Sequence, residues 1–403
     1  MQYSLHLDRP MNFETTSTLR LSCSPGQRDL LADELEHLGV TTQQGGPTGV
    51  ECQGSLLDAM RLNLVSRIAM RVLYRLSSFA CTHPDELSVG VSKIPWEDII
   101  PLNGYFTVTC TVDHPTIDNT MFASLKVKDA IVDRIRGIFS RRPDSGPLRN
   151  AAVIHLHWAG DTAQIWIDTS GQKLADRGYR KMPHLAPLRE TLAAAILQQS
   201  GYTGAAPLVI PMCGSGTLAI EAALMATGRP PGLLRSAYGF QHLVAFNKDA
   251  WDTIRHDATP PKPRRGRTTC PPIIATDINP DAVTATQRNA ETAGVDHLIQ
   301  TDVCDFADTP MPDEKGHLIL HPEYGLRLGE QHDLELLYPR MGDFLKHRCG
   351  GWSSWIYTGN LELAKLIGLR TSCRVPLRNA KVDARLFGYD VWEGRHERED
   401  SPS

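Results

Sequence analysis

The sequence is poor in the arrangements of cysteine that would hold a metal or a disulfide framework. Its nine cysteines stand singly along 403 residues, with no CxxC pair and no cysteine and histidine cluster at zinc spacing. Free thiols indicate a reducing compartment. We therefore expect neither a metal site nor a disulfide scaffold.

Long apolar runs are also missing, since no stretch approaches the roughly 18 uninterrupted apolar residues that a membrane helix needs. The first residues lack the basic stretch followed by an apolar core that is typical of a secretion signal. With 41% hydrophobic and 22% charged residues, the composition suits two or three globular domains. We expect a cytoplasmic protein that has no membrane partner.

Excess positive charge is absent overall, because the formal net charge is -4. Residues 120–150 nevertheless carry seven basic residues against three acidic ones. A local patch of this kind can bind a polyanion, although a solvated helix face followed by a basic loop would have the same composition. The candidate phosphate-binding residues are Lys126, Lys128, Arg141, Arg142 and Arg149.

The first 170 residues mix helical and strand patterns. The leucine spacing of residues 27–39 predicts a helix that ends at Gly39. Residues 55–76 read as a second amphipathic helix, and alternation predicts strands at 105–113, 153–160 and 162–169. A further helix at 122–139 should bury a set of apolar side chains and leave Arg134 accessible. That expected buried set is Phe122, Leu125, Val127, Ile131 and Ile135. Together these elements form an α+β module.

After Ser170 strands and helices alternate. A helical segment at 188–201 precedes strands at 206–210, 273–277, 297–302, 317–320 and 352–359, with helices at 217–226, 280–294 and 361–369. This alternation predicts right-handed crossovers and a mostly parallel sheet covered on both faces. Residues 259–272, rich in proline and basic residues, read as a surface insertion.

The strand at 206–210 leads into a glycine turn that opens directly into a helix. Glycines allow close backbone approach to a ligand, and a helix N-terminus presents N–H groups to polar atoms, so the turn indicates a nucleotide-like cofactor. The turn reads CGSGT, with no arginine or lysine placed for a 2′-phosphate, which favours a nucleoside cofactor. The candidate cofactor residues of the turn are Pro211, Cys213, Gly214, Ser215, Gly216 and Thr217.

Acidic residues end the next two strands. Asp277 stands where a carboxylate can accept both ribose hydroxyls, although an ordinary strand-end carboxylate would look the same. Asn279 is placed to cap a helix that has Pro280 at its first position. Asp302 could accept from an adenine amino group, while Val303 packs on the ring.

Residues 14–394 resemble the N-terminal half of bacterial large-subunit ribosomal RNA guanine-N2 methyltransferases, a class I family with a THUMP domain. Four stretches carry the resemblance: SLKVKDAIVDRI, RGYRKMPHLAPLRETLAAAIL, PMCGSGTLAIEAA and PEYGLRLGE. It implies a ferredoxin-like segment at 14–80, a THUMP RNA-binding domain at 81–170 and a Rossmann-like methyltransferase domain at 171–394, before a disordered tail at 395–403. It further implies S-adenosylmethionine as methyl donor and ribosomal RNA as partner. Those relatives often carry a second methyltransferase domain, and this sequence ends before one could begin.

The sequence departs from the family pattern at two places. Ile210 replaces the acidic residue of Asp-Pro-Met-Cys, so a weaker hold on the cofactor's cationic methionine end is expected. His321, Pro322, Glu323 and Tyr324 replace Asn-Pro-Pro-Tyr. A neutral histidine or the glutamate can still accept a hydrogen bond from an amine, and Tyr324 can still stack on a flipped base. These four residues are the catalytic candidates.

The resulting hypothesis is in-line transfer of a methyl group to the exocyclic N2 of a guanine in large-subunit ribosomal RNA, driven by positioning. One alternative is an RNA-binding or ribosome-assembly protein that keeps the fold without the reaction. Another is a DNA adenine methyltransferase, which shares the Pro-x-Tyr arrangement but leaves the N-terminal module unexplained.

Overall fold

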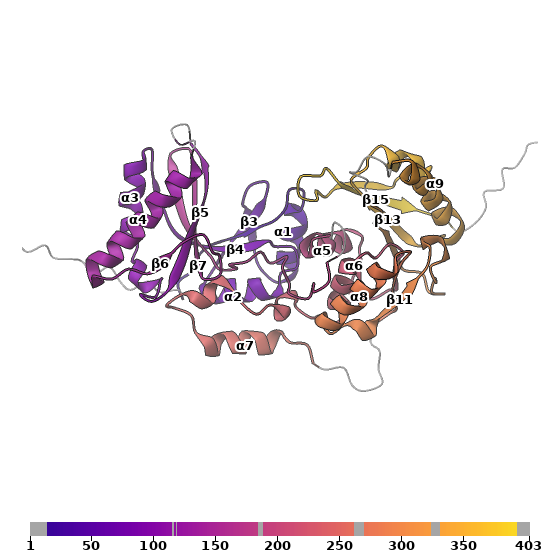
Figure 1. The fold of residues 1–403 in the computed structure, drawn as a ribbon, viewed down its shortest axis with the longest axis horizontal. Helices are drawn as coiled ribbons and strands as arrows, with labels where there is room; N and C mark the ends of the chain where they lie inside the picture. The colour runs from indigo at the N-terminus through magenta and orange to yellow at the C-terminus, as the bar shows by residue number, and fades with distance from the viewer. Residues whose placement is uncertain are drawn as a thin grey trace, which may run out of the picture. The chain divides into compact units, whose positions relative to one another are not determined.

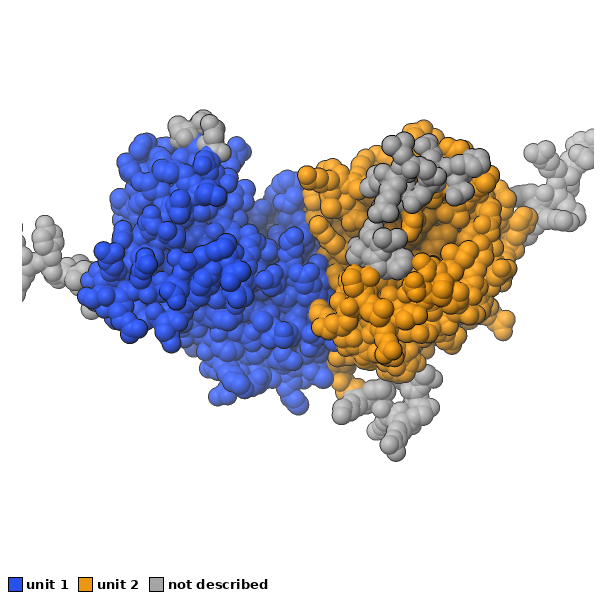
Figure 2. All heavy atoms as spheres, viewed as in Figure 1, with its two compact units in different colours: residues 1–23, 31–177, 230–259 blue, residues 24–30, 178–229, 260–403 orange. Residues whose placement is uncertain are grey.

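The computed structural model describes residues 14–114, 117, 119–183, 188–261, 270–323 and 331–392. They form two compact units that interleave along the chain (Figure 2). Unit 1 comprises residues 1–23, 31–177 and 230–259, and unit 2 comprises residues 24–30, 178–229 and 260–403. None of the described helices is long and apolar enough to cross a membrane.

Unit 1 is built on an eight-stranded sheet in the order β2-β3-β1-β4-β8-β7-β5-β6. Neighbouring strands are antiparallel, except that β5 runs parallel to both β6 and β7. The strands are β1 (Ser17–Ser22), β2 (Thr42–Gln44), β3 (Gly49–Gly54), β4 (Arg71–Ala80), β5 (Tyr105–Asp113), β6 (Asp144–Ser145), β7 (Ala152–Ala159) and β8 (Thr162–Asp168). One continuous sheet therefore runs through both segments of the N-terminal module.

The apolar side of this sheet is covered by helices, as Figure 1 shows for α3 and α4 beside β5. The helices are α1 (Arg28–His37), α2 (Leu56–Val65), α3 (Pro84–Ser92) and α4 (Thr120–Phe139), with a short 3-10 helix η1 (Trp96–Asp98). The Cys110 thiol of β5 lies 3.0 Å from the Ser124 hydroxyl of α4, which identifies the covered side. Leu19, Ile154 and Leu156 are fully buried on the same side.

The expected helix over 55–76 is wrong in its second half. Ser55 caps α2 in a capping box with Asp58, but the helix ends at Val65, and residues 71–80 form β4. Ser66 is extended, with ψ 130°, which turns the chain out of the helix. The β-branched and aromatic residues beyond it favour a strand once neighbouring strands are present, and this tertiary pairing overrides the local helical spacing.

Helix α4 is confirmed, but its buried side is narrower than expected. Val127, Ile131 and Ile135 are fully buried, whereas Phe122 and Leu125 are 42% and 46% exposed. Both exposed residues lie in the first two turns of the helix. The apolar stripe that the sequence indicates is therefore wider than the sheet can cover.

Residues 230–259 lie within the range expected for the methyltransferase domain, but they pack in unit 1. They contain α7 (Lys248–Ala258) and two 3-10 helices, η2 (Pro231–Leu234) and η3 (Gly239–His242). Trp251 of α7 meets the Tyr238 ring edge-on at 5.3 Å. The Arg235 guanidinium donates to the carbonyls of Lys173 and Asp176, at 2.7 and 2.8 Å, which fastens this segment to the end of the N-terminal module.

Unit 2 is a seven-stranded sheet in the order β11-β10-β9-β12-β13-β15-β14. The first five strands in this order are parallel and β15 is reversed, which confirms the expected mostly parallel sheet. The strands are β9 (Leu208–Ile210), β10 (Ile273–Asp277), β11 (Ile299–Val303), β12 (His317–Leu320), β13 (Ser353–Thr358), β14 (Cys373–Pro376) and β15 (Arg385–Asp390). The helices are α5 (Glu190–Gln199), α6 (Thr217–Ala226), α8 (Pro280–Ala293) and α9 (Gln331–Arg348), with 3-10 helices η4 (Asp296–Leu298), η5 (Phe306–Asp308) and η6 (Leu363–Ile367).

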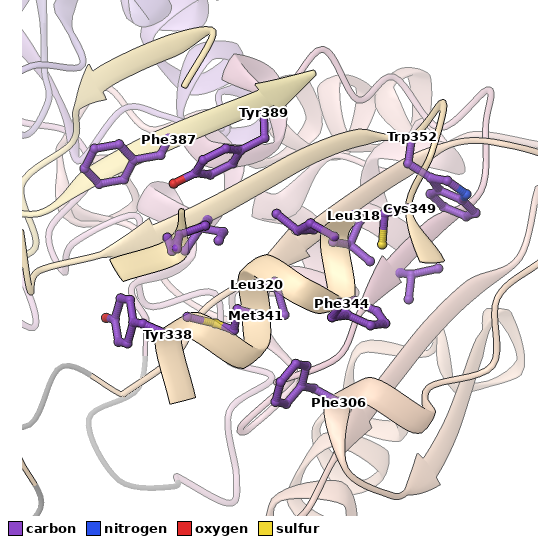
Figure 3. Close-up of a cluster of buried hydrophobic side chains, with 14 of the residues drawn as sticks. Phe306, Leu318, Leu320, Tyr338, Met341, Phe344, Cys349, Trp352, Phe387 and Tyr389 are labelled. Carbon is purple, nitrogen blue, oxygen red and sulfur yellow. The ribbon is translucent and has the colours of Figure 1, made fainter. Parts of the chain in front are cut away.

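Helix α9 packs on one face of this sheet. Figure 3 shows Tyr338, Met341 and Phe344 projecting from α9 toward side chains of β12 and β15. Tyr338 and Met341 are fully buried. The Tyr338 hydroxyl lies 2.5 Å from that of Thr358, the last residue of β13, so the polar end of the ring is also satisfied. One side of α9 is therefore buried against the sheet, while the other side, which includes Leu336, is exposed.

We predict that Gly316→Ala lowers the free energy of unfolding by about 1–3 kcal/mol. An added Cβ would lie 2.1 Å from the Pro207 carbonyl oxygen, which already accepts the His317 N–H at 2.8 Å, so the backbone has little freedom to retreat. Denaturant titration measures the loss. As a comparison, an added Cβ at Gly137 of α4 meets nothing within 4 Å, and Gly137→Ala should stabilise slightly. Equal stability of the two variants would show that the contact at Gly316 relaxes freely.

Candidate active site

The carboxyl ends of β9, β10, β11 and β12 lie along one edge of the unit 2 sheet. The chain order reverses between β9 and β12, and in open α/β sheets ligands bind at such a switch point. The candidate residues all follow these four strand ends: 211–217 after β9, 277 at the end of β10, 302 and 303 at the end of β11, and 321–323 after β12. The topology thus brings the sequence-predicted groups to a common edge.

The glycine turn adopts a conformation that only glycines accept easily. Gly214 and Gly216 have φ of +55° and +83°, and Gly216 caps α6. A Cβ at Gly216 would lie 2.7 Å from the Thr286 side chain, whereas a Cβ at Gly214 would meet nothing within 4 Å. One glycine is therefore required by packing of α6 against α8. The other leaves open space where a ligand can approach the backbone.

Asp277 joins the two loops of the site. Its carboxylate accepts from the backbone N–H of Gly214 at 2.9 Å and from that of Asn279 at 3.0 Å. The Asn279 side chain in turn caps α8 by accepting from the Asp281 N–H, as the sequence indicates. Each carboxylate oxygen still has a second acceptor position. The carboxylate therefore faces the turn and can accept further donors.

Asp302 and Val303 lie beside Asp277 in the parallel register, where Asp277 is level with Val303. Asp302 is exposed, and its carboxylate accepts from the Val303 N–H at 2.8 Å. Val303 is 48% exposed at the end of β11, the edge strand of the sheet. An exposed apolar surface next to an acceptor suits a flat heteroaromatic ring.

Of the four catalytic candidates, His321, Pro322 and Glu323 are described, and Tyr324 lies outside the described residues. The His321 ring lies 5.5 Å from that of Tyr357, whose hydroxyl donates to the Leu377 carbonyl. Burial lowers the pKa of His321 to about 4, so the ring is neutral near pH 7. Glu323 is exposed and Pro322 is buried.

Two other side chains near the strand ends, those of Ile210 and Cys213, are chemically unreactive in this setting. Ile210 ends β9 fully buried, so this position offers no charge to a ligand. Burial raises the pKa of the Cys213 thiol to about 12, which keeps it protonated and weakly nucleophilic. Cys213 is therefore unsuited to act as a nucleophile.

Two residues that the motifs did not single out hold the turn in place. Asn289 of α8 donates to the Ser215 carbonyl and accepts from the backbone N–H groups of Lys181 and Met182, at distances of 2.8–3.0 Å. Arg180 donates to the Ser215 hydroxyl at 2.9 Å. Glu190 at the start of α5 accepts from the same guanidinium at 2.9 and 3.1 Å.

Arg180 lies within the stretch RGYRKMPHLAPLRETLAAAIL, which carries the family resemblance. That stretch contains other arginines, and the sequence alone does not distinguish Arg180 from them. Only the fold shows that its side chain, 16% exposed, reaches the cofactor turn. Burial raises the pKa of Glu190, and the charge of Arg180 opposes that shift.

The basic residues of α4 are largely neutralised. Lys126 pairs with Asp85 at 3.3 Å and Lys128 with Asp129 at 3.1 Å. Arg134, expected to be accessible, donates to both carboxylate oxygens of Glu97 at 2.8 and 2.6 Å, and that expectation is wrong. Arg141, Arg142 and Arg149 are exposed beyond the helix. Among the described residues no group of three or more His, Cys, Asp or Glu is arranged to hold a metal ion.

Comparison with family models places three matches on this chain. Residues 177–387 match the RMKL-like methyltransferase domain, residues 18–73 the RlmL ferredoxin-like domain, and residues 81–168 the THUMP domain. The first match covers most of unit 2 together with residues 230–259 of unit 1, and the other two cover most of the eight-stranded sheet of unit 1.

Curated relatives match nearly the whole chain. A ribosomal RNA large subunit methyltransferase K/L of Syntrophotalea carbinolica is 38% identical over 406 residues, which cover 98% of this chain and 56% of that protein. The chain thus spans about half the length of the K/L relatives it matches. The protein slr0064 of Synechocystis is 32% identical over 378 residues, covering 94% of this chain and 98% of that one. The crystal structure of SMU.472 complexed with SAH is 26% identical, with a TM-score of 0.83, and covers 94% of this chain and 99% of that chain.

We predict that His321 titrates near pH 4, since burial disfavours its charged form. The unfolded chain takes up this proton near pH 6.5 and the folded chain does not, so the stabilising contribution is complete above that pH and is lost as pH falls toward 4. Ring-proton chemical shifts followed by NMR, assigned with a His321→Gln variant, give the midpoint. A midpoint near 6.5 would show that the ring is solvated.

Proposed function

The chain belongs to the RMKL-like methyltransferase family, and on that premise we propose that it transfers a methyl group from S-adenosylmethionine to a guanine of large-subunit ribosomal RNA. The observation that carries the proposal is the hydrogen bond between the Gly214 N–H and Asp277. It places an acceptor carboxylate beside an open glycine turn, and the His321 to Glu323 segment follows the neighbouring strand β12. The name of the Syntrophotalea relative and the SAH complex of SMU.472 support the same activity.

The residues of the turn fit a nucleoside cofactor. Open space at Gly214, the free acceptor positions of Asp277 and the exposed apolar side chain of Val303 suit a backbone contact, a ribose and a base respectively. When bound, the cofactor supplies a methyl group on a cationic sulfur. Pro211, Cys213, Ser215, Gly216 and Thr217 shape the wall of this site, and Asp302 offers an acceptor at its end.

The chemistry needed from the protein is orientation. An exocyclic amine conjugated with a base is a weak nucleophile, because its lone pair is delocalised. A neutral His321 accepts one N–H of the amine and turns the lone pair toward the methyl group, while Glu323 receives the proton that the amine releases. Positioning of this kind lowers a barrier by up to about 7–11 kcal/mol.

The low pKa of His321 is compatible with the proposed reaction. A charged imidazole would have both nitrogens protonated and would repel the donor amine, whereas burial keeps the ring in the form that accepts. The rival, an RNA-binding assembly factor, is separated from this proposal by the methyl-transfer measurement described below. A DNA adenine methyltransferase leaves the THUMP match unexplained.

Guanine N2 is proposed as the acceptor on the family resemblance, and RNA as the substrate on the THUMP match and the names of relatives. A protein that modifies bacterial ribosomal RNA acts in the cytoplasm. We propose the division into residues 14–80, 81–170 and 171–394, with 230–259 packing back onto unit 1, and a tail at 395–403. Lys126, Lys128, Arg141, Arg142 and Arg149 are the proposed contacts to phosphates, and Tyr324 is proposed to stack on the flipped base.

We predict that Asp277→Ala weakens binding of S-adenosylhomocysteine at least tenfold, because the ribose loses its acceptor and the Gly214 N–H loses its partner. Isothermal titration measures the affinity. The matched control is Asp281→Ala, which removes an exposed carboxylate in the first turn of α8. Equal affinity for both variants would place the cofactor elsewhere.

We predict that His321→Ala abolishes methyl transfer while the affinities for cofactor and RNA stay within about threefold of the wild type. Incorporation of labelled methyl groups into ribosomal RNA, followed by mapping of N2-methylguanine, measures turnover and acceptor together. His321→Gln, which can still accept a hydrogen bond, should keep part of the rate. Full activity of His321→Ala would remove the histidine from the reaction, and a product other than N2-methylguanine would change the acceptor.

A further inference from the structure

The eight-stranded sheet of unit 1 has a second side, opposite the helices, where basic side chains stand beside the buried Leu73 and Trp166. Strand residues alternate between the two sides. Because Leu19, Ile154 and Leu156 lie on the covered side, their neighbours Arg20 and His155 lie on the opposite one. In a mostly antiparallel sheet, one side often packs on the core while the other side faces solvent. The open side continues without a break from the ferredoxin-like segment into the THUMP segment.

Strand register gathers basic side chains on this open side. Arg20 is level with Leu73 of β4, and the same side of β4 carries Arg71 and Arg75. Arg75 is level with Trp166 of β8, which is level with His155 of β7. The cluster comprises Arg20, Arg71, Arg75, His155 and His157 from strands, and Arg149 from the loop before β7.

These groups are close enough to influence one another. Burial, together with the smaller effects of the charges on His157, Arg149, Arg71 and Arg20, lowers the pKa of His155 to about 4. Arg149 lies in the loop that leads into β7, and burial and the charge of Arg71 lower its pKa. The Thr109 hydroxyl lies 2.9 Å from His155 Nδ1 and fixes that ring.

The cluster keeps unbalanced positive charge. Glu51 lies 3.5 Å from Arg20, and Asp168 pairs with Arg71. Arg75 lies over the Trp166 ring at 5.8 Å, and among the described residues neither Arg75 nor Arg149 pairs with a carboxylate. In contrast, the lysines of α4 each face an aspartate. A polyanion therefore gains more on the open sheet side than on the helix.

We propose that the RNA backbone crosses this open side of the sheet, with Arg75 and Arg149 as its principal phosphate contacts. The inference rests on the proposed function and changes its RNA-binding surface from α4 to the sheet. The four adjacent strands β1, β4, β8 and β7 together span roughly 14 Å, at about 4.8 Å between neighbouring strands.

The test compares charge reversals in the full chain. Binding of a short fluorescein-labelled single-stranded oligoribonucleotide is measured by anisotropy as salt is raised. Arg75→Glu combined with Arg149→Glu should weaken binding by on the order of tenfold or more, and should reduce the slope of log affinity against log salt by about 1.4. The control, Arg61→Glu with Lys93→Glu, makes the same charge change at exposed positions of α2 and after α3, on the covered side, and should leave both quantities unchanged.

A third variant, Arg141→Glu with Arg142→Glu, separates the two surfaces. A loss confined to this variant, or no loss in the sheet variant while the wild type binds RNA, would overturn the inference and leave the proposed function standing. No binding by the wild type would instead count against the proposed function. Unchanged affinity for S-adenosylhomocysteine and an unchanged melting curve show that the variants fold; if the glutamates unfold the sheet, Arg75→Gln with Arg149→Gln replaces them, with a smaller loss expected.

Discussion

The Gly214 N–H donates to the Asp277 carboxylate, and this hydrogen bond connects two loops that belong to different crossovers of the parallel sheet. The residues around this hydrogen bond make further contacts that hold the two loops in place. Asn279 continues from Asp277 into the cap of α8, and Thr286 of α8 donates back to the Gly214 carbonyl at 2.9 Å. The turn is thus held from the strand and from the helix, before any ligand arrives. Preorganisation of this kind reduces the ordering cost of binding.

The same constraint explains which parts were predictable. The glycine turn, Asp277 and the Asn279 cap each combine a special backbone conformation with a local sequence pattern. The local structure of residues 207–226 and 273–294 can therefore be predicted from those residues themselves. The order of elements in unit 2 followed for a similar reason, since alternating strands and helices allow few topologies. The family resemblance supplied what spacing could not, namely the chemistry.

What the sequence did not reveal depends on distant partners. Residues 71–80 carry leucines and arginines that fit a helix locally, and they form a strand because β1 and β8 lie on either side of them. Phe122 and Leu125 fit a buried stripe whose width is set by the sheet beneath α4. Arg180 and Arg134 were indistinguishable as arginines, yet one reaches the cofactor turn and the other pairs with Glu97. Such differences arise from tertiary contacts rather than from local pattern.

The two departures from the family motifs differ in their physical effect: Ile210 removes a charged group, whereas His321 provides a hydrogen-bond acceptor. Ile210 removes a charge and is fully buried, so that strand end contributes packing alone, and Arg180 with Glu190 becomes the ion pair nearest the turn. His321 keeps an acceptor where the family has an amide, and its burial protects the neutral form on which acceptance depends. A ring that is neutral near pH 7 is the form that can accept a hydrogen bond, so the residue at 321 is compatible with the proposed reaction. The residue at 210 bears instead on how firmly the proposed cofactor is held.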